Sequence, residues 1–299
     1  MSERIAYFNG EYIRESEARI SIYDRGFMNG DAAFDVARTF GHRPFKWEDH
    51  VARFFRSLHY LRVDLGLTPE QVLGIAQEVF KRNQQLLAPN DDYMVRWVGT
   101  PGEDRFKTPL KPTVLVYCTP IPFGGFARRY AEGIHLVVAL HRALPAQCLD
   151  PKAKLYSRAH YALADVEAKS VDPNAYSLLL DVDGHVTEGS TSNLFMVKAG
   201  KLLSPTTNDI LEGMSRATIL DLAHGLGIET LETDLGVYDL YNADEVFISA
   251  TSFVMLPVAR LNTRPLGKPV PGPITRRLLS AWNELVGVDV AEQALSHVS

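Results

Sequence analysis

Glu188 is a single carboxylate in the run VTEGSTSNLF, where small polar residues lead directly into an apolar strand. A carboxylate held about 4 Å from a ring nitrogen, at an effective dielectric near 20, contributes about 4 kcal/mol of charge attraction. That energy corresponds to roughly three pKa units, which keeps a pyridine nitrogen protonated near neutral pH. Such a ring is the electron sink of pyridoxal phosphate chemistry. The alternative is a glutamate that solvates the edge of a hairpin.

Lys154 is a candidate nucleophile in the segment DPKAKLYSRAHYALADVEA. It precedes a predicted helix on which Tyr161, Ala164 and Ala168 would face a core. A lysine that is held near positive charge or out of water loses part of its proton affinity and attacks carbonyl groups. Residue type alone does not separate Lys154 from Lys152, and a solvated surface lysine is the alternative for both.

The segment LEGMSR, residues 211–216, indicates an anion site at the start of a helix that continues with ATILDLAHGLG. The first backbone N–H groups of a helix lack intrahelical partners, and the helix dipole adds partial positive charge, so phosphate suits this position. The alternative is an ordinary turn in which a serine caps the helix.

The elements that must position these residues differ between the two halves of the chain. In the first half, Asn9-Gly10 predicts a hairpin between IAYF and EYI. A helix is expected after DRGFMNGD, another over 47–62, and a third that opens with a capping box at Thr68. YMVRWVG and TVLVYC are expected to be strands.

In the second half, SLLLDV, HVTEG, NLFMV and KLLS alternate with turn dipeptides and predict a β-meander. The Pro- and Gly-rich segment 119–127 is the expected linker between two domains. These patterns together predict an α+β protein with a small domain over 1–118 and a larger one over 128–299.

Composition excludes several classes of protein. A net charge of -5 leaves no basic surface for nucleic acid. The N-terminus MSERIAYFNG lacks a signal-peptide pattern, and no apolar run approaches the roughly 20 residues that span a bilayer, so a cytoplasmic protein without membrane association is expected. Cys118 and Cys148 show no disulfide or zinc spacing, so both are expected to be packing residues and no metal is expected.

Taken together, the three segments resemble the class IV aminotransferases, the fold-type-IV pyridoxal 5′-phosphate enzymes. The family signature is matched by Glu188, Asn193, Leu194 and Phe195, followed by LEGMSR, and the resemblance extends from FNGEY to PITRRL. Ser204 stands where the family usually has Thr. The resemblance implies a two-domain fold, with a small N-terminal α/β sandwich and a larger, β-barrel-like C-terminal domain that carries helices and binds the cofactor.

The resemblance also implies a role for individual residues. Lys154, thirteen positions before Glu167, would carry the cofactor and move protons between the substrate Cα and the cofactor C4′. Glu188 would bind the pyridine nitrogen, and Arg53 in EDHVARFFRSL would clasp the phosphate, although from the residues alone it is equally a solvated helix arginine. The remaining expected cofactor contacts are Ser192, Asn193, Met214, Ser215, Thr251 and Arg158, and the expected substrate contacts are Phe34, Val36, Arg105 and Ser252.

Substrate choice is open at the level of sequence. Phe34-Asp35-Val36 and the preceding DRGFMNGD look most like (R)-amine transaminases, whereas YMVRWVG lacks the basic residue two after Tyr that branched-chain enzymes use. Arg158, followed by His160, is expected near the cofactor ring oxygen or the substrate carboxylate. Arg105 in GEDRFKTP is expected to swing in toward an α-carboxylate and out for an apolar amine.

The sequence therefore predicts a pyridoxal phosphate-dependent transaminase with ping-pong kinetics, moving an amino group from an (R)-amine or a branched-chain amino acid to a keto acid. Relatives form active sites at a dimer interface, so a homodimer is expected. The alternatives are a D-amino acid aminotransferase, a lyase like aminodeoxychorismate lyase, and a non-catalytic small-molecule binder.

Overall fold

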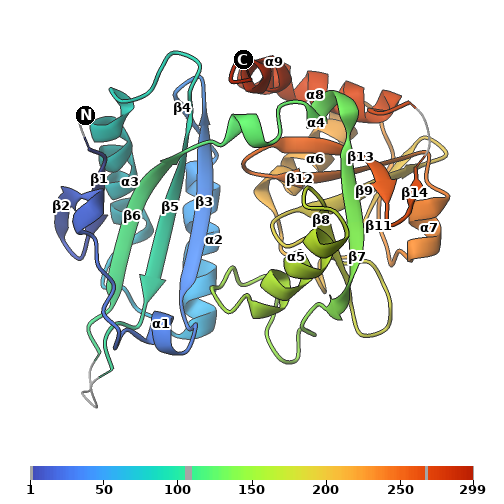
Figure 1. Cartoon of the computed structure of the whole chain (residues 1–299). Helices are drawn as coiled ribbons and strands as arrows, with labels where there is room; N and C mark the ends of the chain where they lie inside the picture. The colour runs from blue at the N-terminus through green and yellow to red at the C-terminus, as the bar shows by residue number, and fades with distance from the viewer. Residues whose placement is uncertain (1–2, 105–109, 267–268, 299) are drawn as a thin grey trace. The chain divides into compact units, whose positions relative to one another are not determined.

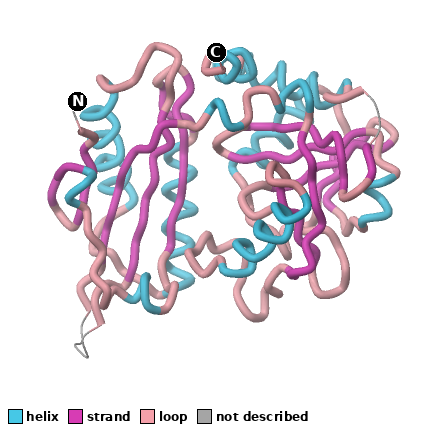
Figure 2. The backbone as a smooth tube through the Cα atoms, viewed as in Figure 1, coloured by secondary structure: helices cyan, strands magenta, loops and turns pink. Residues whose placement is uncertain are grey.

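The computed structural model describes residues 3–104, 110–266 and 269–298 of the chain (Figure 1). The chain divides into two compact units. Unit 1 consists of Met1–Ile121 and the short segment Ala153–Ser157, and unit 2 consists of Pro122–Lys152 and Arg158–Ser299. Each unit contains a β-sheet with helices packed on it, as the colouring of Figure 2 shows, so the fold is α+β.

Unit 1 is built on a six-stranded antiparallel sheet in the order β2-β1-β6-β5-β3-β4. The predicted hairpin is confirmed, because Asn9 and Gly10 adopt the positive φ angles of a two-residue turn, 49° and 107°. The strands are β1 (Ile5–Phe8), β2 (Glu11–Arg14), β3 (Ala33–Phe40), β4 (Arg43–Phe45), β5 (Tyr93–Thr100) and β6 (Thr113–Pro120).

Two long helices, α2 (Trp47–Leu61) and α3 (Pro69–Gln84), pack against this sheet. The apolar stripe predicted over 47–62 is buried at Val51, Phe54 and Leu58. Thr68 caps α3 through its side chain, which accepts from the N–H of Gln71 at 3.3 Å, so the predicted capping box is confirmed. A short 3-10 helix, η1, spans Glu15–Glu17.

The helix expected after DRGFMNGD is wrong. Only the four residues of α1 (Arg25–Met28) are helical there, and β3 follows directly. Nearly every residue of β3 is buried, so the segment lacks the alternation that would identify a strand exposed on one face.

Unit 2 is built on a mixed sheet in the order β11-β10-β9-β12-β13-β7-β8, with β14 paired to β13. The β10–β11, β7–β13 and β7–β8 pairs are parallel and the others antiparallel. The strands are β7 (Ile134–Arg142), β8 (Tyr176–Leu180), β9 (Asn193–Lys198), β10 (Lys201–Ser204), β11 (Thr230–Glu232), β12 (Glu245–Ala250), β13 (Val254–Leu261) and β14 (Arg264–Pro265).

The helices of unit 2 include the two on which the predicted site depends, α5 and α6. Tyr161, Ala164 and Ala168 of α5 are buried, as their helical spacing predicts. The helices are η2 (Phe123–Gly125), α4 (Arg129–Glu132), α5 (Ala159–Val171), α6 (Met214–Gly225), α7 (Val237–Tyr241), α8 (Pro273–Val286) and α9 (Val290–Leu295).

The predicted β-meander is only partly correct: β9 and β10 form an antiparallel hairpin, but β8 pairs with β7 and is not a neighbour of β9 in the sheet. SLLLDV, NLFMV and KLLS largely coincide with β8, β9 and β10, but HVTEG is not a strand and forms only the isolated bridges Leu180↔Val186 and Glu188↔Asn193. Cys118 is buried, whereas Cys148 is exposed and is not a packing residue. In the part of the chain that is described, no helix is long and apolar enough to cross a membrane.

The division between the units falls inside the segment 119–127, between Ile121 and Pro122. The ranges differ from the sequence-based domains at one place, because residues 153–157 belong to unit 1 and not to the larger C-terminal unit. This segment carries Lys154.

Candidate active site

The segment around Lys154 extends the sheet of unit 1 at the start of β3. Leu155 forms an antiparallel bridge with Ala33. The N–H of Phe34 donates to the carbonyl of Lys154 at 3.0 Å, and the N–H of Tyr156 donates to the carbonyl of Ala32 at 2.9 Å. The lysine is therefore held by backbone hydrogen bonds to a buried strand, in the same way as a residue in a regular strand.

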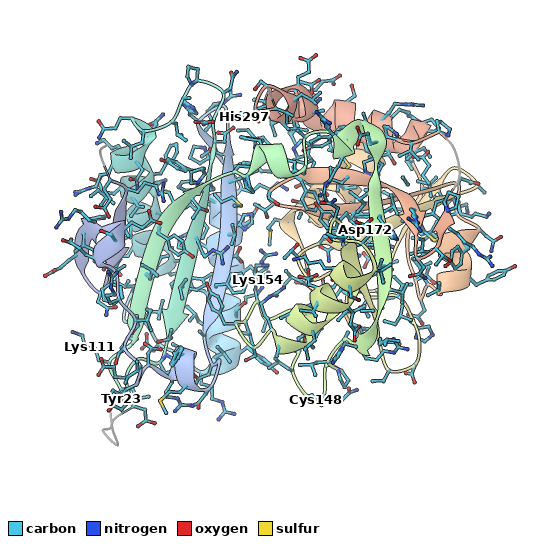
Figure 3. All side chains as sticks on the ribbon, in the orientation of Figure 1. Tyr23, Lys111, Cys148, Lys154, Asp172 and His297 are labelled. Atoms are coloured by element: carbon cyan, nitrogen blue, oxygen red, sulfur yellow. The ribbon has the colours of Figure 1, made fainter. Side chains whose placement is uncertain are left out.

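Alternation along paired strands puts the side chains of Lys154 and Tyr156 on the same face of the sheet as Phe34, and Leu155 on the opposite face. The Lys154 Nζ lies 5.0 Å from the centroid of the Phe34 ring, and the Tyr156 ring lies 4.5 Å from it. Figure 3 shows Lys154 beside β3. Phe34 and Lys154 are therefore neighbours on one face of the sheet, and their roles toward substrate and cofactor stay predictions.

Three further side chains share this face, because Val36, Arg96 and Tyr117 form one cross-strand row over β3, β5 and β6. We call the whole set the lysine face; it consists of Phe34, Val36, Arg96, Tyr117, Lys154 and Tyr156.

The predicted phosphate ligand Arg53 lies on the other side of β3, in a buried ionic network. Its Nε and Nη2 donate to the two carboxylate oxygens of Asp35, both at 2.8 Å, and His50 Nδ1 contacts Oδ1 of the same carboxylate at 2.7 Å. Burial alone would raise the pKa of Asp35, but Arg53 and His50 more than offset it and lower that pKa. Burial lowers the pKa of His50, although Asp35 opposes this.

Asp35→Asn is expected to lower the free energy of unfolding of unit 1 by about 3 to 5 kcal/mol at pH 7, because it leaves Arg53 buried without its counter-charge. The contribution of Asp35 is fully present above its ordinary pKa of 3.8 and is lost as the pH falls below that value. Urea unfolding followed by tryptophan fluorescence measures this effect, since Trp47 and Trp97 are both buried in unit 1.

The matched control is Asp49→Asn, which changes an exposed carboxylate in the first turn of α2, the helix that carries Arg53 and His50. An equal loss in both variants, or a difference between wild type and Asp35→Asn that persists unchanged below pH 3, contradicts the role assigned to the buried network.

In unit 2, Glu188 is 6% exposed and its carboxylate accepts hydrogen bonds from three uncharged donors. The Tyr161 hydroxyl donates to Oε1 at 2.6 Å, while the Asn193 amide and the Leu211 N–H donate to Oε2 at 2.9 and 3.1 Å. These bonds fix the orientation of the carboxylate and favour its charged form. Glu188 and Asn193 are thus joined directly, while their roles toward a cofactor stay predictions.

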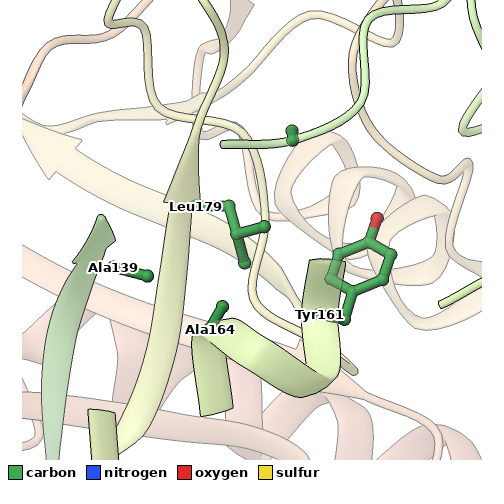
Figure 4. Packing of buried hydrophobic residues seen from close by; sticks show 5 residues of the cluster. Ala139, Tyr161, Ala164 and Leu179 are labelled. Carbon is green, nitrogen blue, oxygen red and sulfur yellow. The ribbon is translucent and has the colours of Figure 1, made fainter. Parts of the chain in front are cut away.

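Tyr161 was placed in the core by its helical spacing, and its contact with Glu188 was missed. Its ring packs with Ala139, Ala164 and Leu179 (Figure 4), and its hydroxyl reaches the carboxylate. Burial, with the nearby charge of Glu188, raises the pKa of Tyr161 well above 10, so the hydroxyl stays a donor. A tyrosine at an apolar helical position, where an alanine or leucine would pack as well, is the only sequence signal for this role.

Asn193 also ties the carboxylate to the start of α6. Its Nδ2 donates to the carbonyl of Leu211 at 2.9 Å, and its Oδ1 lies where a Cβ on Gly213 would stand, at 2.0 Å. Only glycine fits at position 213, the residue before the helix. Met214 and Ser215 are the first residues of α6, so the predicted helix start is confirmed and their N–H groups lack intrahelical partners.

The other predicted residues of unit 2 have the following surroundings. Ser192 is buried, and its carbonyl accepts from the Gly189 N–H at 2.7 Å. Thr251 and Ser252 lie in the turn between β12 and β13. Ser204, the departure from the family pattern, accepts from Arg216 Nε at 3.0 Å, so its hydroxyl holds the basic residue of the signature.

Arg158 lies next to the Glu188 cluster, although its predicted cofactor contact stays a prediction. It donates to the carbonyl of Ser190, and its guanidinium carbon lies 4.3 Å from the centroid of the Tyr161 ring. Burial and the charge of Arg158 lower the pKa of His160 to about 4, so His160 is neutral at pH 7. Arg105 lies outside the described residues.

Comparison with known proteins identifies the family. Residues 32–261 match the family model described as amino-transferase class IV, which covers well over half of the chain. A putative branched-chain-amino-acid aminotransferase from Methanocaldococcus jannaschii is 31% identical over 280 residues, covering 93% of this chain and 95% of that protein. A D-alanine aminotransferase from Staphylococcus haemolyticus is 29% identical over 287 residues, covering 94% and 97%.

The fold matches solved structures as well. A T.th. branched-chain amino acid aminotransferase complexed with N-(5′-phosphopyridoxyl)-L-glutamate has a TM-score of 0.84 at 27% identity, covering 96% of this chain and 95% of that one. The branched-chain amino acid aminotransferase from Escherichia coli has a TM-score of 0.83 at 25% identity, covering 95% of both chains. The chain therefore belongs to the class IV aminotransferase family and is a pyridoxal 5′-phosphate-dependent transaminase.

Proposed function

We propose that the enzyme transfers the amino group of an amino acid to a keto acid by a ping-pong mechanism, with Lys154 as the catalytic base and Glu188 as the partner of the cofactor ring. The observation that carries the proposal is the buried Glu188 carboxylate, which accepts hydrogen bonds from Tyr161, Asn193 and Leu211. These bonds fix the orientation of the carboxylate, and a carboxylate held in this way attracts a protonated ring nitrogen.

The residues of unit 2 fit pyridoxal phosphate at both ends of the molecule. The buried carboxylate suits the ring nitrogen, and the N–H groups of Met214 and Ser215 suit the phosphate, with Gly213 leaving the space that Asn193 needs. Arg53 and the hydroxyls of Ser215 and Thr251 are further proposed phosphate ligands. When bound, the cofactor supplies an aldehyde that condenses with amines and a protonated ring that accepts electrons from the substrate Cα.

The protein residues carry the remaining steps. Lys154 would hold the cofactor through Nζ, and the same amine would accept the proton that leaves the substrate Cα. The extended backbone of residues 154–156 fixes where this amine lies, through its bonds to Phe34 and Ala32. The ring of Phe34 beside Nζ excludes water from one side of the amine.

Amino acids, and not simple amines, are the proposed donors. The relatives with the stated identities include a putative branched-chain-amino-acid aminotransferase and a D-alanine aminotransferase, whose substrates carry an α-carboxylate. We therefore assign the enzyme to the amino acid branch of the family and keep the (R)-amine type, suggested by DRGFMNGD, as the second candidate. A cytoplasmic homodimer is part of the proposal, and the dimer rests on the family resemblance.

A half-reaction screen tests the donor class. The purified enzyme is mixed with L-leucine, D-alanine or (R)-1-phenylethylamine, and loss of the yellow absorbance of the lysine-bound cofactor is followed. We expect one of the two amino acids to react at least tenfold faster than the amine, which corresponds to about 1.4 kcal/mol of transition-state stabilisation. If (R)-1-phenylethylamine is the fastest of the three, the amino acid assignment is wrong.

A further inference from the structure

Arg96 is a half-buried cation on the lysine face, and the described ion pairs do not neutralise it. It lies on β5 between Val36 of β3 and Tyr117 of β6, all three on the face that carries Lys154. Its Nε is buried and has no hydrogen-bond partner among the described residues. The one hydrogen bond described for its side chain runs from Nη1 to the Tyr156 hydroxyl, at a long 3.4 Å.

The surroundings of Arg96 are aromatic. Its guanidinium carbon lies 5.4 Å from the centroid of the Phe34 ring and 5.9 Å from that of Tyr117. Rings fix the plane of a guanidinium without using its N–H donors, so the planar fork stays available to a bidentate acceptor. The buried Nε–H without an acceptor carries a desolvation penalty, which an anion bound to the guanidinium would relieve.

The position of Arg96 relative to Lys154 indicates which anion would bind there. Phe34 contacts both cations, since Nζ of Lys154 lies 5.0 Å and Cζ of Arg96 lies 5.4 Å from the same ring centroid. One face of the sheet therefore carries a reactive amine, on Lys154, and a planar guanidinium, on Arg96. This pair matches a molecule that has a carbonyl or amine carbon and, a few bonds away, a carboxylate.

We propose that Arg96 binds a carboxylate of the amino acid and keto acid substrates. The inference rests on the proposed function, in which Lys154 reacts with the substrate carbon, and it extends that function by naming the residue that selects acids over simple amines. YMVRWVG has no basic residue two after Tyr93, and Arg96 lies on the opposite face of β5 from that position, on the face that carries Lys154. Tyr156 supports the guanidinium through its hydroxyl and through its packing on Phe34.

The test compares Arg96→Gln with wild type in the keto acid half-reaction of the pyridoxamine phosphate form. Three probes are used: pyruvate, 2-oxoglutarate and methyl pyruvate, whose ester removes the carboxylate charge. We expect the apparent Kd of the two acids to rise by about 10- to 100-fold, the usual effect of losing a hydrogen bond to a charged group, while that of methyl pyruvate changes less than about twofold. Arg96→Lys should give an intermediate effect for the acids.

Comparing the three probes shows which carboxylate Arg96 binds. A rise for 2-oxoglutarate alone assigns Arg96 to the distal carboxylate, and a rise for both acids assigns it to the α-carboxylate. Unchanged binding of both acids, or an equal loss for all three probes, overturns the proposal. The control is Arg14→Gln, an exposed arginine on β2 of the same sheet.

A second readout does not depend on turnover. Glutarate, which cannot react, is titrated calorimetrically into the holoenzyme and into Arg96→Gln, and we expect the variant to bind at least about tenfold more weakly. Equal binding overturns the proposal. Failure of the proposed function is seen separately, as purified protein without yellow absorbance whatever residue stands at position 96.

Discussion

Lys154→Ala is expected to lower kcat by at least about 10³-fold and to abolish the yellow absorbance of the purified enzyme. The variant removes the amine that holds the cofactor and moves the Cα proton, and a positioned general base alone contributes about 10² to 10⁴-fold. The rest of the site should survive, because the bonds to Phe34 and Ser57 are made by the backbone of Lys154. Steady-state kinetics and an absorbance spectrum measure both effects.

The control for this prediction is Lys152→Ala, two residues earlier in the same loop. Lys152 is half-exposed and pairs with Asp150 at 3.6 Å in unit 2. Its loss should leave both the spectrum and kcat within about twofold of wild type, since exposed ion pairs contribute little. Loss of colour in Lys152→Ala together with retained colour in Lys154→Ala would reverse the assignment that the sequence left open between the two lysines.

Glu188→Gln is expected to lower kcat by about 10²- to 10³-fold while the lysine-bound cofactor remains visible. The substitution keeps the size of the side chain and removes the charge, which is worth roughly three pKa units at the ring nitrogen. The glutamine amide would also face a donor, because Tyr161, Asn193 and Leu211 all donate to this carboxylate. Stopped-flow measurement of Cα proton removal, with α-deuterated substrate, locates the loss in the chemical step.

Glu188→Gln is also expected to lower the free energy of unfolding by about 1 to 3 kcal/mol, because its amide N–H group would face another hydrogen-bond donor. Thermal unfolding of the variant measures this loss. The control is Glu229→Gln, an exposed carboxylate of the same unit that pairs with Lys201. If Glu188→Gln is destabilised but retains wild-type kcat, the carboxylate is structural and its assigned role at the ring is wrong.

The start of α6 at Met214 and the closeness of Glu188 and Asn193 were predictable from sequence because their signal is local. Glu188 and Asn193 lie five positions apart in one segment, and Gly213 and Met214 are consecutive residues of a second. The strongly periodic helix over Trp47–Leu61 and the Asn9-Gly10 turn are local in the same sense. Each of these features depends on residues a few positions apart.

The lysine face was not predictable, because its residues meet only through sheet register. Leu155 pairs with Ala33 across 122 positions of chain, and nothing in the local pattern assigns residues 153–157 to unit 1. The significance of Arg96 likewise appears only when its cross-strand neighbours Val36 and Tyr117 are known. The contact of Tyr161 with Glu188 was not predictable for another reason. Its ring fits the apolar pattern of α5, and only its hydroxyl donates to Glu188.

The most direct test of the account is borohydride reduction of the native enzyme followed by peptide mapping. Reduction makes the bond between the cofactor and its lysine permanent, so the labelled residue can be read by mass spectrometry. The account predicts a single pyridoxyl label, on Lys154. A label on any other lysine, or unlabelled protein after reconstitution with pyridoxal 5′-phosphate, would contradict it.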